Sequence, residues 1–240
     1  MAEFAAYGPS HWTVLAVTAV GVAALIVLGK RGDARLAGPG TKALAVVLLA
    51  LNLSEHIRAF DPAHVTHTLP LQLSDLASYV CAYALWTRRR GACALTYYWG
   101  ITLSTQALLT PALAGPDFPS LQFLVFFASH VLVVWAAIFL SWGLRLAPSW
   151  PGYRFTVAVT ACWAAATLVF NRLAGTNYGF LNAKPETGSI LDLLGPWPWY
   201  LVPEVALLLL VWALMTAPWQ PRTRVAGRRA DQPHDSPRLR

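Results

Sequence analysis

Charged side chains are scarce in this sequence. Asp, Glu, Lys and Arg make up 12% of its 240 residues and hydrophobic residues make up 56%, whereas charged residues are about 25% of an average soluble domain. So little charge cannot supply the polar surface of a water-soluble domain. The composition therefore excludes an ordinary soluble protein and predicts an all-α, polytopic membrane helix bundle.

Cysteine is rare too, and Cys81, Cys93 and Cys162 lie inside apolar segments without a short pairing interval. Neither a disulfide framework nor a structural zinc site is predicted, and the three thiols are expected to be buried. Glycine signatures for phosphate or dinucleotide binding are missing, so we expect no cofactor. The start of the chain lacks a basic region and a cleavage pattern, so its first apolar run is expected to remain as a helix.

Apolar runs of about 17 to 25 residues are long enough to span a bilayer. The breaks between them are rich in Gly, Pro or charge. Together the runs predict seven transmembrane helices and a single transmembrane domain over residues 1–217. The runs are 12–28, 41–60, 70–86, 93–113, 121–145, 155–173 and 198–217.

The positions of the 18 Lys and Arg residues predict the orientation. Most lie in the first, third and fifth breaks and in the tail, and cytoplasmic loops carry such an excess. We therefore expect the N-terminus outside, the C-terminus in the cytoplasm, and a multi-pass protein of the cell membrane. Residues 218–240 are basic and lack apolar periodicity, so they predict a disordered tail. The net charge of +7 is expected to face anionic lipid, not nucleic acid.

Polar side chains recur at one depth in this arrangement. The rise of about 1.5 Å per residue places them in the outer half of six spans. Each costs free energy in hydrocarbon unless it meets a partner or water, so we predict an outward-facing polar pocket. Packing contacts between helices are an alternative for the hydroxyls and amides. The residues are Asn52, Glu55, His56, Gln72, Ser74, Asp75, Thr102, Thr105, Gln106, Gln122, His130, Asn171 and Glu204.

The most specific reaction that these residues allow uses a hydroxyl as nucleophile and a histidine as the base that accepts its proton. Ser74 would be the nucleophile, His130 the general base, and Asp75 or Glu55 the acid that orients it. Since Ser74 lies about 6 to 8 Å below the start of its segment and His130 about 15 Å below its own, contact requires helix tilt or a late helix start. Substrate contacts and oxyanion donors are expected from His56, Gln72, Gln106, Asn177, Trp199 and Glu204.

Two alternatives use the same polar groups. A metal site would combine His64 and His67 with Glu55, His56 or Asp75, but no second ligand pair stands at a defined interval. A transporter, or a protein that binds lipid or a small molecule without catalysis, would use the outward pocket. Transport predicts broken helices, for which Pro70 and Pro203 are the only hints.

Several motifs resemble those of the YwaF-like, transmembrane protein 164 related family of integral membrane proteins. They occur in the family's order and cover roughly residues 12–217. The last, with its Gly-Pro-Trp-Pro-Trp core, is the most specific. The motifs are LPLQLS at 69–74, YWGI at 98–101, TQALLTP at 105–111, FP at 118–119 with QF at 122–123 and His130, GTNY at 175–178, KPET at 184–187 and LDLLGPWPWY at 191–200.

The resemblance implies a seven-helix or similar membrane fold. For the eukaryotic relative it implies acyl transfer onto lysophospholipid through a cysteine, with a histidine on a later helix. His130 matches that histidine, whereas Ser74 occupies the cysteine position and Gln72 that of a histidine in bacterial members. We therefore expect a membrane acyltransferase or acyl hydrolase acting on phospholipid or lysophospholipid, with the 175–199 loop over the pocket mouth.

Overall fold

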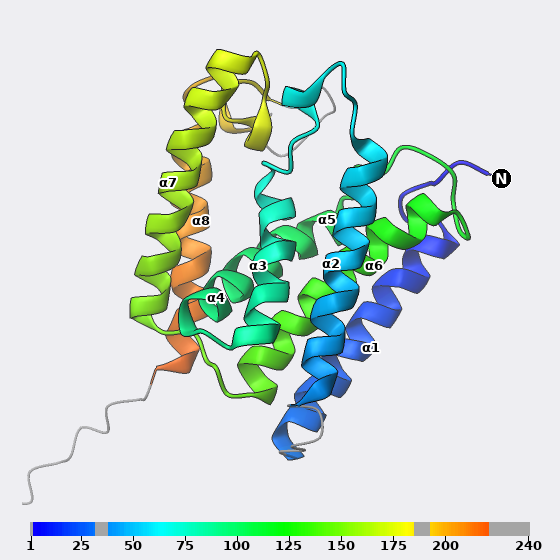
Figure 1. Cartoon of the computed structure of the whole chain (residues 1–240). Coiled ribbons are helices and arrows are strands. Elements are labelled where there is room, and N and C mark those ends of the chain that lie inside the picture. Colours follow the sequence, from blue (N-terminus) through cyan, green and yellow to red (C-terminus); the bar gives the residue numbers. More distant parts are fainter. Residues whose placement is uncertain (1, 32–37, 185–192, 221–240) are drawn as a thin grey trace, which may run out of the picture.

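The computed structural model describes residues 2–31, 38–184 and 193–220, and within them the prediction of an all-helical fold is confirmed (Figure 1). Most of the predicted basic tail, residues 221–240, lies outside the described residues. So do parts of two family motifs, at 185–187 and 191–192. The one backbone bridge found among the described residues joins Glu3 to Pro116.

Each of the seven predicted segments is helical over most of its length. The stretch at 90–109 is continuous but changes to π-helical geometry in its middle, and α6 ends in a π-helical turn. The long elements are α1 (Pro9–Arg31), α2 (Pro39–Ala59), α3 (Leu73–Thr87), α4 (Arg90–Leu95) with η2 (Thr96–Ser104) and α5 (Thr105–Leu109), α6 (Leu121–Ile138) with η3 (Phe139–Gly143), α7 (Trp150–Ala174) and α8 (Leu201–Thr216). Short 3₁₀ turns are η1 (Val65–His67), η4 (Tyr178–Phe180) and η6 (Ala217–Trp219).

Four helical stretches among the described residues are long and apolar enough to cross a membrane: Pro9–Gly29, Leu121–Gly143, Trp150–Ala174 and Leu201–Trp219. The other three, α2, α3 and the 90–109 stretch, fall short of that standard. α3 has only 15 residues, and α2 carries Lys42, Glu55 and Arg58. Four of the seven predicted transmembrane helices therefore meet this standard.

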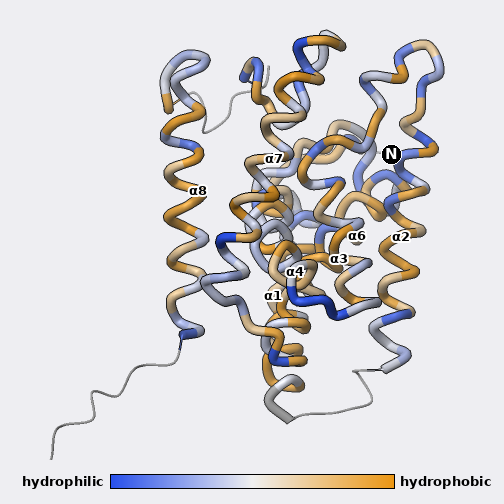
Figure 2. Tube along the Cα trace, turned by 60° about the vertical axis from the view of Figure 1, so that its left-hand side comes forward, coloured by the Kyte–Doolittle hydropathy of each residue, from blue (hydrophilic) through white to orange (hydrophobic). Residues whose placement is uncertain are grey.

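Burial differs between the helices of the bundle. In α1, α7 and α8, 6%, 11% and 11% of the apolar window is buried, whereas in α6 the share is 67%. The first three lie at the edges of the bundle and show apolar side chains outward, and Figure 2 shows α8 apolar over most of its length. α3 and the first half of the 90–109 stretch are mostly buried or half-buried and need less hydrophobic surface of their own, whereas most of α2 is exposed.

The centre of the bundle is built by α2, α3, α4 and α6. On α2 the buried residues are Thr41, Ala45, Leu48 and Asn52, which repeat at helical spacing and form one face. That face packs on α3 and α6, where Cys81 and Val133 are fully buried. Cys93 is buried as expected, whereas Cys162 is exposed, so the prediction that all three thiols are buried is wrong for Cys162.

Gly21 of α1 leaves the space that the Trp135 indole of α6 occupies. A Cβ atom at this position would lie 2.2 Å from the indole carbons of Trp135, whose Nε1–H donates to the Thr18 carbonyl at 3.1 Å. Gly21→Ala is therefore expected to destabilise the protein by about 1–3 kcal/mol through overpacking, measured as a lower midpoint of thermal unfolding in detergent. Gly40→Ala is the matched control, since nothing lies within 4 Å of its Cβ position. Equal midpoints for the two variants would contradict this packing argument.

Candidate functional site

The helix that carries Ser74 begins later than predicted. The sequence predicts a start at Pro70, but residues 69–72 are not helical and α3 begins at Leu73. Gln72 precedes it in an extended conformation, with φ −62° and ψ 141°. A start three residues later moves the first turn about 4.5 Å along the chain direction. A late helix start was one of the two conditions under which Ser74 and His130 could meet, and their contact stays a prediction.

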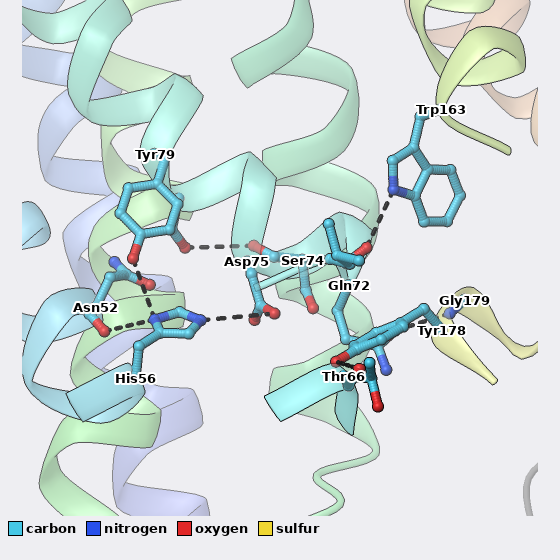
Figure 3. Close-up of polar contacts among 12 residues, drawn as sticks. Asn52, His56, Thr66, Gln72, Ser74, Asp75, Tyr79, Trp163, Tyr178 and Gly179 are labelled. Atoms are coloured by element: carbon cyan, nitrogen blue, oxygen red, sulfur yellow. Dashed lines mark hydrogen bonds and ion pairs between the residues drawn. The ribbon is translucent and has the colours of Figure 1, made fainter. Parts of the chain in front are cut away.

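Side chains from distant segments hold the non-helical approach to α3, as Figure 3 shows. The indole of Trp163 donates to the Leu71 carbonyl at 3.1 Å, and the Tyr178 hydroxyl donates to the Thr66 carbonyl at 2.9 Å. Burial raises the pKa of the Tyr178 phenol, which keeps it a donor. Because the carbonyls of Thr66 and Leu71, which precede α3, find these partners, the chain can run non-helically into the bundle.

Gln72, predicted to contact substrate, joins α3 to the loop that follows α7. Its Oε1 accepts a hydrogen bond from the Gly179 N–H at 2.9 Å. Gly179 has φ +67°, and a Cβ there would lie 2.5 Å from the Trp163 ring. Only glycine suits both the backbone angle and the space. The loop therefore lies against the approach to Ser74.

A second side-chain cluster, between α2 and α3, surrounds His56. Its Nδ1 lies 2.7 Å from the Asn52 carbonyl and 3.1 Å from the Tyr79 hydroxyl. Its Nε2 lies 3.7 Å from Asp75 Oδ2. The Asn52 carbonyl can accept a hydrogen bond from Nδ1–H, and Nε2 faces the Asp75 side chain (Figure 3). The structure thus brings the predicted residues His56 and Asp75 together.

Tyr79 belongs to this cluster, and the sequence reasoning missed it. It lies in the apolar run after Asp75, where an aromatic residue is usually assigned to the hydrophobic core. The available signal was its spacing of four residues from Asp75, which places both side chains on one face of a helix.

Ser74 occupies the first turn of α3, next to Asp75. Its hydroxyl is partly buried and forms no hydrogen bond among the described residues, while its carbonyl accepts a bond from Ser78 Oγ at 3.4 Å. The N–H groups of Asp75 and Leu76 bond to the Gln72 carbonyl. The N–H groups of Leu73 and Ser74 have no bond in the described part of the chain, as expected for a helix start.

His130 lies three turns into α6 and is held by its own helix. Its Nδ1 lies 2.7 Å from the Phe126 carbonyl, and its ring packs on that of Phe126 at 4.6 Å between centroids. The proton therefore sits on Nδ1 and leaves a lone pair on Nε2. Glu55 interacts electrostatically with both His130 and Asp75. No hydrogen bond or ion pair found among the described residues joins His130 to Ser74.

Four predicted contact residues lie apart from this group. Gln106 is exposed on α5, and Trp199 is 69% exposed. Glu204 lies in the first turn of α8, and its charge interacts electrostatically with the Tyr200 hydroxyl. Asn177 closes its own loop: its amide donates to the Ala183 carbonyl at 2.8 Å, and its oxygen accepts from two backbone N–H groups.

The alternative of a metal site finds no support, since the described residues contain no group of three or more His, Cys, Asp or Glu able to hold an ion. His64 instead bonds to Asp61 at 2.8 Å in the exposed loop before η1. This bond, with that of the Ala63 N–H, lowers the pKa of Asp61.

Two cavities lie elsewhere in the bundle. One, of about 640 Å³, lies between the start of α2 and the end of α3. The other, of about 480 Å³, is an apolar groove between α1 and α6.

A profile of the TMEM164 family matches residues 6–216. No curated protein and no solved structure matches the chain.

Proposed function

The chain belongs to the TMEM164 family of membrane proteins, and from this membership we propose that it is a multi-pass protein of the cell membrane that transfers or hydrolyses lipid acyl groups at Ser74. Its seven long helical stretches cross the bilayer, with the N-terminus outside and the C-terminus in the cytoplasm. The four most apolar stretches support the membrane crossing, and the Lys and Arg distribution supports this orientation.

The environment of Ser74 is the observation on which the proposal rests. A free hydroxyl stands in the first turn of a helix, beside the Asp75 carboxylate that faces His56 at 3.7 Å. The positive end of the α3 backbone dipole and the free N–H groups of Leu73 and Ser74 lie at the same turn. Such donors stabilise the oxyanion that forms when an acyl carbonyl is attacked. We assign the oxyanion donors to these N–H groups and not to Asn177, because the Asn177 amide donates its hydrogen bond within its own loop.

In the proposed reaction the Ser74 oxygen attacks the ester carbonyl of a phospholipid and His130 Nε2 accepts the hydroxyl proton. The ester C–O bond then breaks, the acyl group remains on Ser74, and His130 returns the proton to the departing lipid alkoxide. A lysophospholipid hydroxyl or water next attacks the acyl-serine, which gives transfer or hydrolysis. The Nδ1 bond to Phe126 holds the tautomer that this role needs.

The proposal is tested by covalent labelling at Ser74. Purified protein in detergent is treated with a fluorophosphonate or an acyl-donor phospholipid, and the modified peptide is identified by mass spectrometry. We expect one adduct on Ser74, absent from Ser74→Ala. Ser74→Cys is expected to form a thioester with the lipid, because a thiol at this position restores the nucleophile that the family resemblance implies. Ser78→Ala, one turn along α3, is the control and should label normally.

The second candidate is a transporter or a non-catalytic lipid-binding protein that uses the same polar groups. The non-helical approach around Pro70 favours it, since broken helices form transporter binding sites, whereas Pro203 lies inside α8 and breaks nothing. Lipid that binds to the protein while Ser74 stays unmodified would favour this candidate over the enzyme.

A further inference from the structure

The cavity of about 640 Å³ lies at the opposite end of α3 from Ser74. It is bounded by the first turn of α2 and the last residues of α3, which Figure 1 shows at the lower end of the bundle. Among the described residues that line it, none is acidic. The lining residues are Gly38, Pro39, Thr41, Lys42, Trp86 and Arg88.

Two cations from different helices meet at this cavity without an acidic partner. The ion pairs among the described residues are both His–Asp pairs and involve neither Lys42 nor Arg88. Lys42 Nζ lies 5.3 Å from the ring centroid of Trp86, a cation–π contact that leaves its ammonium donors unused. All three side chains are exposed. Two positive charges that line one cavity, with no ion-pair partner among the described residues, raise the affinity of the cavity for an anion.

The backbone conformation of Arg88 also supports an anion site at this cavity. This residue ends α3 in the left-handed region, with φ 54° and ψ 23°, and its N–H bonds to the Ala84 carbonyl at 2.8 Å. Glycine is the usual residue there, because a side chain strains this conformation. An arginine is therefore held at the rim of the cavity against the local backbone preference. Strain of this kind is often found at binding sites.

From these features we infer that the cavity, here named the basic cavity, binds the phosphate group of an anionic phospholipid. A guanidinium and an ammonium both donate to phosphate oxygens. An indole such as that of Trp86 settles at the headgroup level of a bilayer. Basic pockets between membrane helices are suited to lipid headgroups, and Figure 2 shows strongly hydrophilic residues at the turn before α4. The inference depends on the membrane placement but not on the chemistry at Ser74.

The experiment compares variants of equal charge. The full chain is placed in nanodiscs of phosphatidylcholine with increasing phosphatidylglycerol, and lipids retained on the protein are counted by native mass spectrometry. We expect the Lys42→Gln/Arg88→Gln double variant to bind phosphatidylglycerol about 10- to 30-fold more weakly than the unaltered chain. The control is Arg89→Gln/Arg90→Gln, which removes two neighbouring exposed charges outside the cavity lining and should stay within about threefold, because exposed charges without a direct contact are screened by salt.

A second arm separates lipid phosphate from free phosphate. Inorganic phosphate added to phosphatidylcholine nanodiscs is expected to leave the unfolding midpoint unchanged, whereas phosphatidylglycerol raises it. Stabilisation by inorganic phosphate alone would overturn the assignment to lipid. Equal losses of phosphatidylglycerol binding in the two double variants would contradict binding at the basic cavity. If the first double variant does not fold, Lys42→Gln alone decides the question, because Lys42 is exposed. A loss of less than twofold in that variant would contradict the proposal.

Discussion

Replacing His130 with alanine is expected to lower acyl turnover by about 10²- to 10⁴-fold, the usual contribution of a general base. The variant keeps Ser74 and the α3 first turn but has no Nε2 lone pair to accept the serine proton. Turnover is measured as transfer of a labelled acyl chain from phospholipid to lysophospholipid, or its release as fatty acid, in mixed micelles. The unfolding midpoint is measured in parallel to separate loss of chemistry from loss of fold.

The structure supplies two controls for this experiment. His67→Ala removes an exposed histidine of the loop before α3 and should leave turnover within about twofold. His56→Ala removes the partner of Asp75, so we expect a smaller loss than in His130→Ala. If turnover survives His130→Ala but is lost in His56→Ala, the base is His56 and the assignment to His130 is wrong.

Asn171→Ala is expected to produce the largest loss of stability, about 2–4 kcal/mol in the free energy of unfolding. The amide is 2% exposed and joins the end of α7 to the following loop. Its Nδ2 donates to the Tyr178 carbonyl and to Asn182, and its Oδ1 accepts from Thr176 and from the Tyr178 N–H, all at 2.8 or 2.9 Å. Alanine would leave the buried backbone groups of Tyr178 without partners.

The effect is checked by thermal unfolding in detergent and by limited proteolysis of the loop, which should be cut faster in Asn171→Ala. Asn177→Ala is the matched control, because it removes the same kind of side chain from the loop that Asn171 holds, where two of its three bonds are exposed to solvent. We expect it to cost less than about 1 kcal/mol. Similar losses in the two variants would show that burial of the Asn171 bonds has little effect on stability.

Composition and the length of apolar runs predicted the helical class and the approximate position of each helix. These properties depend on each segment and its solvent, since a long apolar run is stable in lipid as a helix whatever its neighbours are. The same reasoning placed Glu55, His56 and Asp75 at one depth, and in the structure they lie close enough to interact.

Only the tertiary structure decided which polar groups meet. Asp75 faces His56, Gln72 and Asn177 are bound within loops, and α3 begins at Leu73. The contacts between helices depend on their rotation, tilt and starting residue, which are fixed by packing partners far away in the sequence. For α3 those partners are Trp163 and Tyr178, about 90 residues or more along the chain. Periodicity within one segment carries no information on them.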